Sequence, residues 1–293
     1  MRYYTGPDTL FIRGAFRAAS TGIAGGIRNA ATLFNHTVPA DWSHDEPAKE
    51  IALIAAAAGA GSDVLGQLTA VPIRNLCVLQ YDFITVFVTA GIRQEPAGGN
   101  GAGTINIIAY SSEGMEDSAL LETIMVATEA KAEALLAAGR VSGTPTDAVI
   151  AASEGEVKHH YAGRITEPGR RVRDAVLKGV PEALRRYERG GITEPAFFIY
   201  SRFEGGHWVE WLPHNCPYYP CHFAGQACDF CYCPFYPCRN EELGEWSPSS
   251  TNGRVWNCSG CTLLHEPAVA DYLKRYPDAP LAELMRLKPK QKK

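Results

Sequence analysis

The sequence predicts an α/β domain in which buried strands are layered with helices, followed by a small cysteine-rich domain stabilised by metal. Apolar β-type runs alternate with alanine-rich helical stretches over the first 190 or so residues. Eight of the nine cysteines crowd between Cys216 and Cys261. The turn-rich stretch Tyr187–Pro195 separates these two regions. We therefore expect two domains, residues 1–190 and residues 195–293.

Length and composition fit two folded domains and exclude some classes of protein. The chain has 293 residues, is 46% hydrophobic and carries a net charge of −4, which argues against a dedicated nucleic-acid binder. Its first residues lack the apolar segment of a signal peptide. The longest aliphatic run, Ile51–Gly61, is too short to span a bilayer. We expect a cytoplasmic protein without membrane insertion.

Strands are expected at three places in the first domain. The run Val78–Gly91 reads either as two strands or as one long strand that is split near Tyr81-Asp82. The segment "TINIIAY", Thr104–Tyr110, has a continuous isoleucine run, which indicates burial on both faces. Another strand is expected over Thr146–Ala152. These strands would form the core of the domain.

Two of the expected helices flank these strands in the chain. One covers Glu46–Ala58. The other covers Glu167–Glu188, with Pro168 in its first turn and an expected break at Pro181. Downstream, two aromatic-rich strands flank Gly205-Gly206 and are expected to form a hairpin.

The clearest helix covers residues 116–139. Asp117 or Ser118 can cap its start, and Gly139 is placed to end it. Glu129 and Lys131 lie on opposite margins of its apolar stripe, either as solvated side chains or as a carboxylate and an amine at the rim of a pocket. The helical period predicts that this stripe faces the core, and its members are Leu121, Met125, Thr128, Ala132 and Leu136.

Small polar segments at the ends of strands and helices are the best candidates for chemistry, because the first domain has no standard hydrolase signature. Such segments can present backbone N–H groups and hydroxyls to a ligand, although the same residues also make ordinary turns. The glycine-rich segment before Thr104 precedes a strand, whereas phosphate-binding loops open a helix. The segments are Ser20–Ala30, Phe34–Val38, Gly101–Asn106, Ala127–Lys131 and Ser142–Ala148.

Taken in order, the segments resemble a known family. "AGGIRNA", "FNHTV", "GTINIIAY", "ATEAKAEALL" and "SGTPTDAVIAA" together resemble the adenosylcobinamide amidohydrolases (CbiZ) over roughly residues 10–185. The resemblance implies hydrolysis of the amide that joins aminopropanol to the corrinoid acid, giving adenosylcobyric acid for coenzyme B12 salvage. Two places depart from the family pattern. Pro145 removes a backbone N–H from a loop that is more often G-T-G-T-D, and Thr21–Ala24 replaces a more usual run.

The resemblance also implies roles for individual residues. Amide cleavage needs an activated water or nucleophile, donors for the oxyanion and an acid for the leaving amine. Glu129 and Asp147 are the expected general base and acid, and Thr104 and Asn106 would lie against the amide. The expected substrate-binding residues are Gly25, Gly26, Asn35, His36, Gly103, Lys131, Thr144 and Thr146.

The cysteine cluster predicts metal binding. Cys-Pro-Tyr-Tyr-Pro-Cys and Cys-Pro-Phe-Tyr-Pro-Cys form a near-repeat 17 residues apart, and two C-x-x-C pairs accompany them. In a chain without an export signal, this pattern is more typical of structural zinc than of disulfides. The expected ligands of two four-thiolate sites are Cys216, Cys221, Cys228, Cys231, Cys233, Cys238, Cys258 and Cys261.

Several alternatives stay open at this point. His222 or His265 could replace a thiolate, an iron–sulfur cluster could replace zinc, and the cysteines could be buried without metal. Cys77 lies alone in an apolar run and is expected in the core. The cysteine-rich part resembles a small domain that accompanies such amidohydrolases in some archaeal proteins, which supports metal binding and nothing further.

Three functions follow from these patterns. The first is an amidohydrolase acting on a corrinoid substrate, with metal dispensable for the chemistry because closed four-thiolate sites leave no open coordination position. The second is a non-catalytic corrinoid-binding or delivery protein that docks a protein partner through its cysteine-rich part. The third is an iron–sulfur redox protein. Release of aminopropanol and visible absorbance would separate them.

Overall fold

The computed structural model describes residues 1–43, 45–92, 103–201, 205–211, 216, 218–231, 233–248, 254–276 and 278–288. The chain forms two compact units, one containing Tyr3–Trp211 and the other Leu212–Lys293. The sequence places the boundary earlier, before residue 195. The structure divides the chain later because β11 (Ala196–Ser201) pairs in parallel with β5 (Cys77–Tyr81). The expected hairpin is confirmed, but it belongs to the first unit.

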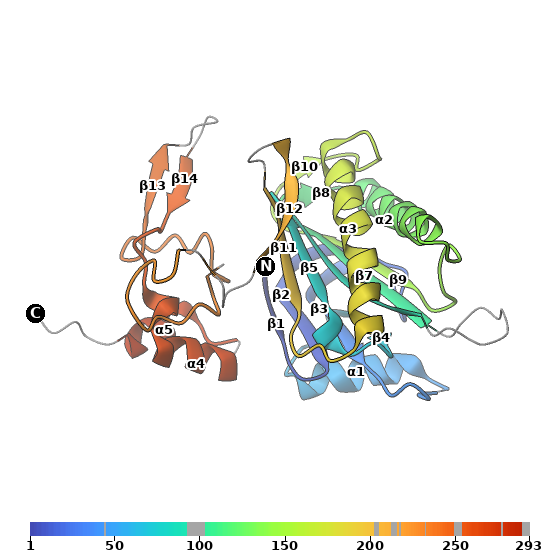
Figure 1. The fold of residues 1–293 in the computed structure, drawn as a ribbon, viewed down its shortest axis with the longest axis horizontal. Helices are drawn as coiled ribbons and strands as arrows, with labels where there is room; N and C mark the ends of the chain where they lie inside the picture. The colour runs from blue at the N-terminus through green and yellow to red at the C-terminus, as the bar shows by residue number, and fades with distance from the viewer. Residues whose placement is uncertain are drawn as a thin grey trace, which may run out of the picture. The chain divides into compact units, whose positions relative to one another are not determined.

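A mixed ten-stranded sheet forms the centre of the first unit in the described residues (Figure 1). The strand order is β12-β11-β5-β6-β7-β9-β2-β3-β4, and β1 pairs with β2. The predicted α/β fold is confirmed. The remaining strands are β1 (Arg2–Thr5), β2 (Thr9–Ser20), β3 (Gly26–Thr37), β4 (Val64–Thr69), β6 (Ile84–Ile92), β7 (Gly103–Ser111), β9 (Ala148–Ser153) and β12 (His207–Trp211).

The central strands follow their sequence patterns. Strands β5 and β6 divide as predicted, at a turn in which Asp82 has a φ of +53°. Strand β7 is buried on both faces, as its isoleucine run predicts. Ile105 and Ile107 contribute to the core on one face of the sheet, whereas Ile108 contributes to a second core on the other face. The sheet therefore separates two apolar layers.

Helices cover the sheet. Helix α2 (Asp117–Ala137) and helix α3 (Glu167–Arg189) lie side by side over one face (Figure 1). Helix α1 (Pro47–Ala57) is confirmed at its predicted place and packs with Phe34 of β3. A 3₁₀ turn, Ile73–Asn75, precedes β5. Helix α2 ends before Gly139, whose φ of +70° suits the position after a helix end, as predicted.

The buried face of α2 differs from the prediction. Leu121, Met125 and Leu136 are 48%, 60% and 61% exposed, so the predicted stripe faces solvent. Helix α2 packs closely against β9 and α3, and small side chains let the backbones approach. Alanine contributes little to a hydrophobic period, so the sequence pattern identified the wrong face. The buried residues are Ala119, Leu120, Thr123, Val126, Ala127, Ala130, Lys131, Ala134 and Leu135.

Two further helix predictions are wrong. Helix α3 continues through Pro181. That residue is on the exposed side, while Val180 and Ala183 beside it are fully buried and hold the helix against the sheet. The start of α2 has no side-chain cap. Asp117 instead accepts two hydrogen bonds from the Arg17 guanidinium, at 2.7 and 2.6 Å.

The second unit has a small core. Its strands are β13 (Glu245–Pro248) and β14 (Arg254–Asn257), which pair in antiparallel fashion. A 3₁₀ turn at Leu263–His265 leads into α4 (Pro267–Arg275) and α5 (Leu281–Leu287). Among the described residues of this unit, the buried apolar ones are few: Leu243, Trp256, Leu263, Leu264, Val269, Ala270, Leu273, Ala279 and Leu284. A core of this size is typical of domains that need a further source of stability.

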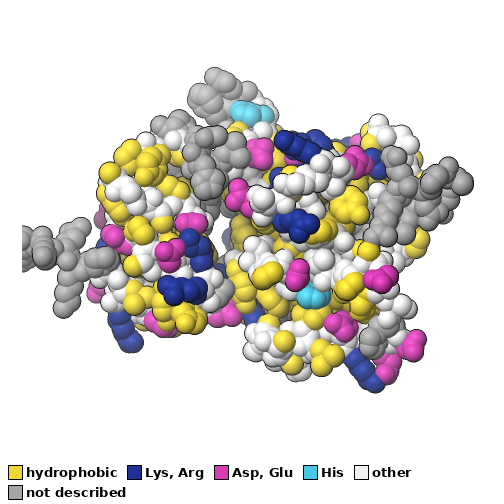
Figure 2. Space-filling model, turned by 60° about the horizontal axis from the view of Figure 1, so that its bottom comes forward, with side chains coloured by type: hydrophobic (Ala, Val, Ile, Leu, Met, Phe, Trp, Pro, Cys, Tyr) yellow, Lys and Arg dark blue, Asp and Glu magenta, His cyan; other side chains and the backbone are white. Residues whose placement is uncertain are grey.

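Two surface properties bear on function. Among the described residues, no helix has the length and apolar character that crossing a membrane requires. On the face drawn in Figure 2, acidic and basic side chains are interspersed among apolar ones.

The small strands β8 (Gly114–Met115) and β10 (Val157–His159) form a separate parallel pair beside the start of α2.

Candidate functional site

A buried ion pair lies at one end of the large sheet. Lys131 of α2 and Asp147, just before β9, bind each other with side-chain exposures of 8% and 9%. A Cβ atom on Gly143 would lie 2.8 Å from Asp147 Oδ2 and 2.9 Å from Lys131 Nζ, so the pair occupies the space of that missing side chain. Either charge would be costly to bury without the other.

Asp147 is saturated with hydrogen bonds. Besides the Lys131 ammonium, the Thr144 N–H donates to it at 2.9 Å, the Thr144 hydroxyl at 2.6 Å and the Ile105 N–H at 2.8 Å. These four donors match the acceptor capacity of an ionised carboxylate. Asp147 therefore joins the loop before β9 to the start of β7, and its acceptor positions are occupied by donors of the protein.

Two threonine hydroxyls lie beside the ion pair. Thr104 Oγ1 and Thr146 Oγ1 are 2.8 Å apart, and Thr146 donates to the Gly103 carbonyl at 2.9 Å. Since the proton of Thr146 is directed to Gly103, Thr104 is the donor in the bond between the two hydroxyls. The lone pairs of Thr104 Oγ1 stay available to a water or to a substrate donor.

A second buried cluster continues along the same face of β7. Asn106 donates from Nδ2 to Asn35 Oδ1 and to the Leu68 carbonyl, both at 2.9 Å. Asn35 in turn donates to Thr89 Oγ1 at 2.8 Å. Asn106 Oδ1 is buried and has no hydrogen-bond partner within the described part of the chain. A buried acceptor of this kind costs about 1–3 kcal/mol and marks a place for a water or a ligand donor.

The turn between β2 and β3 borders this end of the sheet. Gly25 N–H donates to the Gly22 carbonyl at 3.0 Å, and Gly26 has a φ of +98°. A Cβ on Gly25 would lie 2.3 Å from the Ser20 carbonyl oxygen, so only glycine fits there. Thr21 exchanges hydrogen bonds with the backbone of Val149 in β9, each at 3.0 Å. The turn is thus fixed beside the start of β9.

All five polar segments singled out from the sequence contribute a residue to this end of the sheet, but two candidates point elsewhere. Glu129 is 49% exposed and lies 3.7 Å from Arg164, because a helical residue two positions from Lys131 faces away from it. His36 is on the opposite face of β3 from Asn35, with Nδ1 2.6 Å from Thr9 Oγ1, and burial lowers its pKa. Gly101 lies outside the described residues.

Sequence reasoning missed two polar residues of the buried cluster, Gln67 and Thr89. Gln67 donates from Nε2 to the Ile107 carbonyl at 3.2 Å, and its Oε1 is buried without a partner in the residues described. Both are polar residues within otherwise apolar strands. That contrast is the signal that could have identified them.

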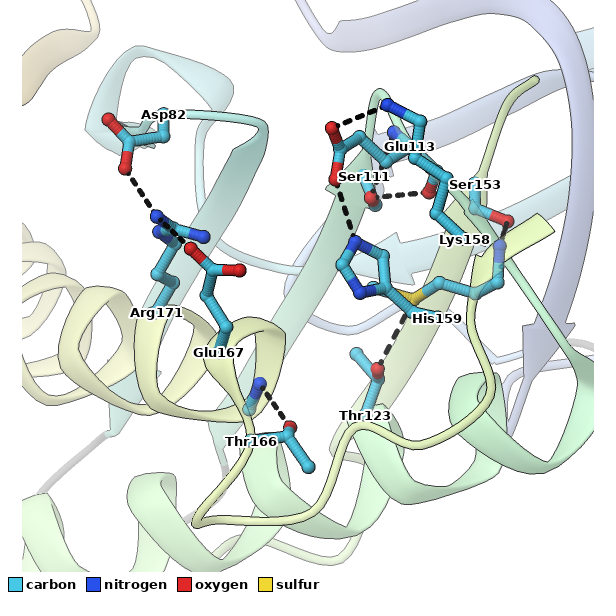
Figure 3. A network of polar contacts seen from close by, with 12 residues as sticks. Asp82, Ser111, Glu113, Thr123, Ser153, Lys158, His159, Thr166, Glu167 and Arg171 are labelled. Atoms are coloured by element: carbon cyan, nitrogen blue, oxygen red, sulfur yellow. Dashed lines mark hydrogen bonds and ion pairs between the residues drawn. The ribbon is translucent and has the colours of Figure 1, made fainter. Parts of the chain in front are cut away.

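Two other features of the first unit lie away from this cluster. Figure 3 shows Glu113 accepting hydrogen bonds from Lys158 and His159, both at 2.8 Å. Burial opposes ionisation of Glu113, but these two bonds lower its pKa below the usual value. An open cleft of about 980 Å³ lies at the other end of β9, at Ser153, and two of its charged residues, Arg17 and Asp117, bind each other. We place the candidate site at the ion pair because its two charges are buried at the end of the sheet where the Thr104 and Thr146 hydroxyls also lie.

The cysteines of the second unit fall into two groups of free thiols. Burial raises the pKa of Cys231, and Cys221, Cys228 and Cys216 raise it further. Burial raises the pKa of Cys233 to about 11, with added contributions from Cys261, Cys258 and Cys238. The first four thiols are thus electrostatic neighbours of one another, and so are the last four. Cys77 is fully buried in the first unit, which confirms its place in the core.

The cysteine thiols of the second unit are suitable metal ligands, although the described residues do not form a complete coordination site. Within the part of the chain that is described, no three metal-binding side chains meet at one point. The grouped thiols, their chemistry and a buried amide donor, Gln226, fit a thiolate site. His265 Nδ1 lies 2.9 Å from the Ala227 carbonyl, which occupies that ring nitrogen. The His222 ring is 4.4 Å from the His265 ring.

Comparisons with known proteins match both units. The family model "Adenosylcobinamide amidohydrolase" matches residues 8–191, and the model "Cysteine-rich small domain" matches residues 207–288. The adenosylcobinamide amidohydrolase of Methanosarcina mazei is 38% identical over 195 residues, covering 63% of this chain and 98% of the relative. That of Halobacterium salinarum is 32% identical over 184 residues, covering 57% and 80%. An uncharacterized protein of Methanocaldococcus jannaschii is 51% identical over 61 residues, covering 21% and 51%.

Proposed function

Because the chain belongs to the adenosylcobinamide amidohydrolase family, we propose that it hydrolyses the amide joining aminopropanol to the corrinoid acid of adenosylcobinamide. Water adds to the amide carbonyl, the C–N bond breaks, and a proton passes to the leaving nitrogen. The products are adenosylcobyric acid and aminopropanol. The observation that carries this proposal is the buried pair of Lys131 and Asp147, with the Thr104 and Thr146 hydroxyls at the same end of the sheet, inside the matched segment.

Each group near the pair has a role in this proposal. The Lys131 ammonium has three donors, one of them directed to Asp147, and it stabilises the oxyanion of the tetrahedral intermediate. Asp147 positions Lys131 and takes no part in proton transfer. The lone pairs of Thr104 orient the attacking water. Asn106 lies on the face of β7 opposite to α2 and supports this end of the sheet through Asn35 and Leu68.

Backbone segments flank the proposed substrate position. The turn at Gly25 and Gly26, the start of β7 at Gly103, and the loop carrying Thr144 and Thr146 are the proposed binding elements. Their support is close packing, since Gly25 meets backbone oxygens and has no room for a side chain, and a Cβ on Gly143 would displace the ends of Lys131 and Asp147. Asn35 holds Asn106 in place. Glu129 and His36 have no part in this assignment.

The test is turnover of adenosylcobinamide by the purified protein, with aminopropanol and the corrinoid acid measured by mass spectrometry. Release of both products in equal amounts is expected. A protein that binds the corrinoid without releasing aminopropanol would instead support the delivery function. Visible absorbance of the protein before substrate is added would point to the iron–sulfur alternative.

The cysteine-rich part supports a second proposal, structural zinc bound through its eight cysteines. When bound, zinc supplies rigid tetrahedral cross-links and no reactive water. The support is the grouping of the thiols and the small core, since zinc can contribute on the order of 10 kcal/mol to the folding of such a domain. Free thiols in this number also favour the reducing cytoplasm. Metal analysis of the purified chain, with turnover measured before and after chelation, tests the proposal.

A further inference from the structure

We propose that the eight cysteines form two unequal metal sites, a solvent-facing outer site and an inner site embedded in the core of the second unit. The inference rests on the proposed zinc binding. It adds which thiols share an ion and which ion leaves first. The outer site consists of Cys216, Cys221, Cys228 and Cys231, and the inner site of Cys233, Cys238, Cys258 and Cys261.

The second unit repeats one local motif. Each site is built from a six-residue Cys-Pro-x-Tyr-Pro-Cys segment followed by a C-x-x-C pair. Both six-residue segments have the same turn, in which the N–H of the fourth residue, a tyrosine, donates to the carbonyl of the first cysteine. The distance is 3.2 Å from Tyr219 to Cys216 and 3.1 Å from Tyr236 to Cys233. Both C-x-x-C pairs close in the same way, at 3.3 Å (Cys231 to Cys228) and 2.9 Å (Cys261 to Cys258). Such turns present both sulfurs to one ion.

Gln226 links the two segments of the outer site. Its Nε2 lies 3.2 Å from Cys221 Sγ and 3.4 Å from Cys228 Sγ, so the two sulfurs share one amide donor. Its Oε1 accepts from the His222 N–H at 2.9 Å and from the Phe223 N–H at 3.2 Å, which fixes the orientation of the amide. The side chain is buried. An N–H group held in this way favours thiolates and orients them.

The four thiols of the inner site share a cavity. All four line one space of about 240 Å³, together with apolar residues such as Leu263 and with Cys231 of the outer site. Cys233, Cys238 and Cys261 pack directly against the apolar core of the unit. An ion held there would join the two segments and the core at one point.

Burial and loop length make the two sites unequal. Cys221 and Cys231 of the outer site are exposed, whereas every thiol of the inner site is at least partly buried. The two segments of the outer site are joined by a short connection, Cys221 to Cys228. The connection in the inner site, Cys238 to Cys258, contains the β13–β14 hairpin. Closing the longer loop removes more chain entropy, and reaching the inner ion requires the core to open. The outer ion is therefore the one that leaves first.

The test uses the full-length protein purified with zinc. Native mass spectrometry should find two zinc ions per chain. A colorimetric chelator should remove them in two phases of one ion each, with rates that differ at least about tenfold. Hydrogen exchange should show β13 and β14 losing protection in the slow phase only.

Two variants and one control assign the phases. Cys228→Ser should leave one zinc ion per chain and abolish the fast phase. Cys261→Ser should abolish the slow phase and deprotect β13 and β14. Cys77→Ala, in the core of the first unit, should keep both ions and both phases.

The outcomes separate the two proposals. A chain without zinc, or with iron, overturns the proposed zinc binding itself. Two zinc ions that leave in one phase, or a fast phase that survives Cys228→Ser, overturn the division into outer and inner sites alone. If a variant fails to fold, the number of phases in zinc release from the unmodified chain still tests the division into outer and inner sites.

Discussion

The two units hold their reactive groups in place by different means. In the first, Lys131 and Asp147 come from a helix and a loop and are fixed by burial, with the loop joined to β7 by a bond between residues 42 apart in sequence. In the second, the thiols are positioned by turns closed between residues three apart, such as Cys258 and Cys261. Damage at the buried pair should therefore affect fold and chemistry together. Damage at the thiols should stay within its own unit.

Lys131→Met should have the largest effect. It leaves Asp147 buried without its counter-charge, so we expect a loss of about 3–5 kcal/mol of stability. Turnover of the folded fraction should fall at least about a hundredfold, because the proposed oxyanion donor is gone. Urea unfolding and single-substrate kinetics measure the two effects.

The matched control for Lys131→Met is Lys49→Met. Lys49 pairs with Glu46 on the surface, with both side chains more than half exposed, so its removal should cost no more than about 1 kcal/mol. A folded Lys131→Met variant with turnover close to that of the control would remove Lys131 from the proposed mechanism.

Gly143→Ala should come next. The added Cβ would lie within 2.9 Å of Asp147 Oδ2 and Lys131 Nζ, so the pair must move. Small displacements of groups at a reacting centre lower the rate strongly, so we expect turnover to fall between about tenfold and about a hundredfold. The free energy of unfolding should fall by about 1–3 kcal/mol. Gly61→Ala meets no atom of the described residues within 4 Å and is the control. Equal turnover in both variants would show that the geometry of the pair does not limit catalysis.

Thr104→Val tests the chemistry of the first unit more gently. The shape is nearly kept while the hydroxyl is lost, so kcat/KM should fall about tenfold or more and stability by about 1 kcal/mol. Thr123→Val removes another buried hydroxyl, one that donates to the Ala119 carbonyl at 2.8 Å away from the cluster. If both variants lose stability while turnover per folded molecule stays normal, Thr104 is structural.

Truncation tests the independence of the units. A chain ending after Trp211 should keep turnover within about twofold, because the large sheet stays complete. A chain ending at Arg189 would lose β11 and the buried Phe198 and uncover the edge of β5, so it should be much less stable. Melting curves and turnover of both chains test this. An inactive but folded chain ending at Trp211 would place part of the chemistry in the cysteine-rich unit.

Glu129→Gln should have the smallest effect. Its side chain is half exposed and makes one long ion pair with Arg164, so turnover should stay within about twofold and stability within about 0.5 kcal/mol. Steady-state kinetics measure the change. A large loss of turnover with an unchanged fold would restore Glu129 as a general base or acid, the pair of roles that the family resemblance implies for Glu129 and Asp147.

Some features of the molecule were determined by local sequence alone. The isoleucine run of β7 requires a strand buried on both faces, and Gly139 ends α2 because glycine readily adopts a positive φ. The division of β5 from β6 at Asp82 is also a local property. In the second unit, the near-repeat of the cysteines sets the turns that group the thiols. Each of these depends on residues only a few positions apart.

The tertiary structure alone decided which side chains meet. Sequence periodicity placed Glu129 and Lys131 symmetrically beside an apolar stripe, yet close packing of alanines turned Lys131 inward to Asp147. The assignment of β11 to the first unit depends on its pairing with β5, more than a hundred residues earlier. Strand pairing and burial over such separations leave no periodic signal in the local sequence, because they depend on which distant surfaces the folded chain brings together.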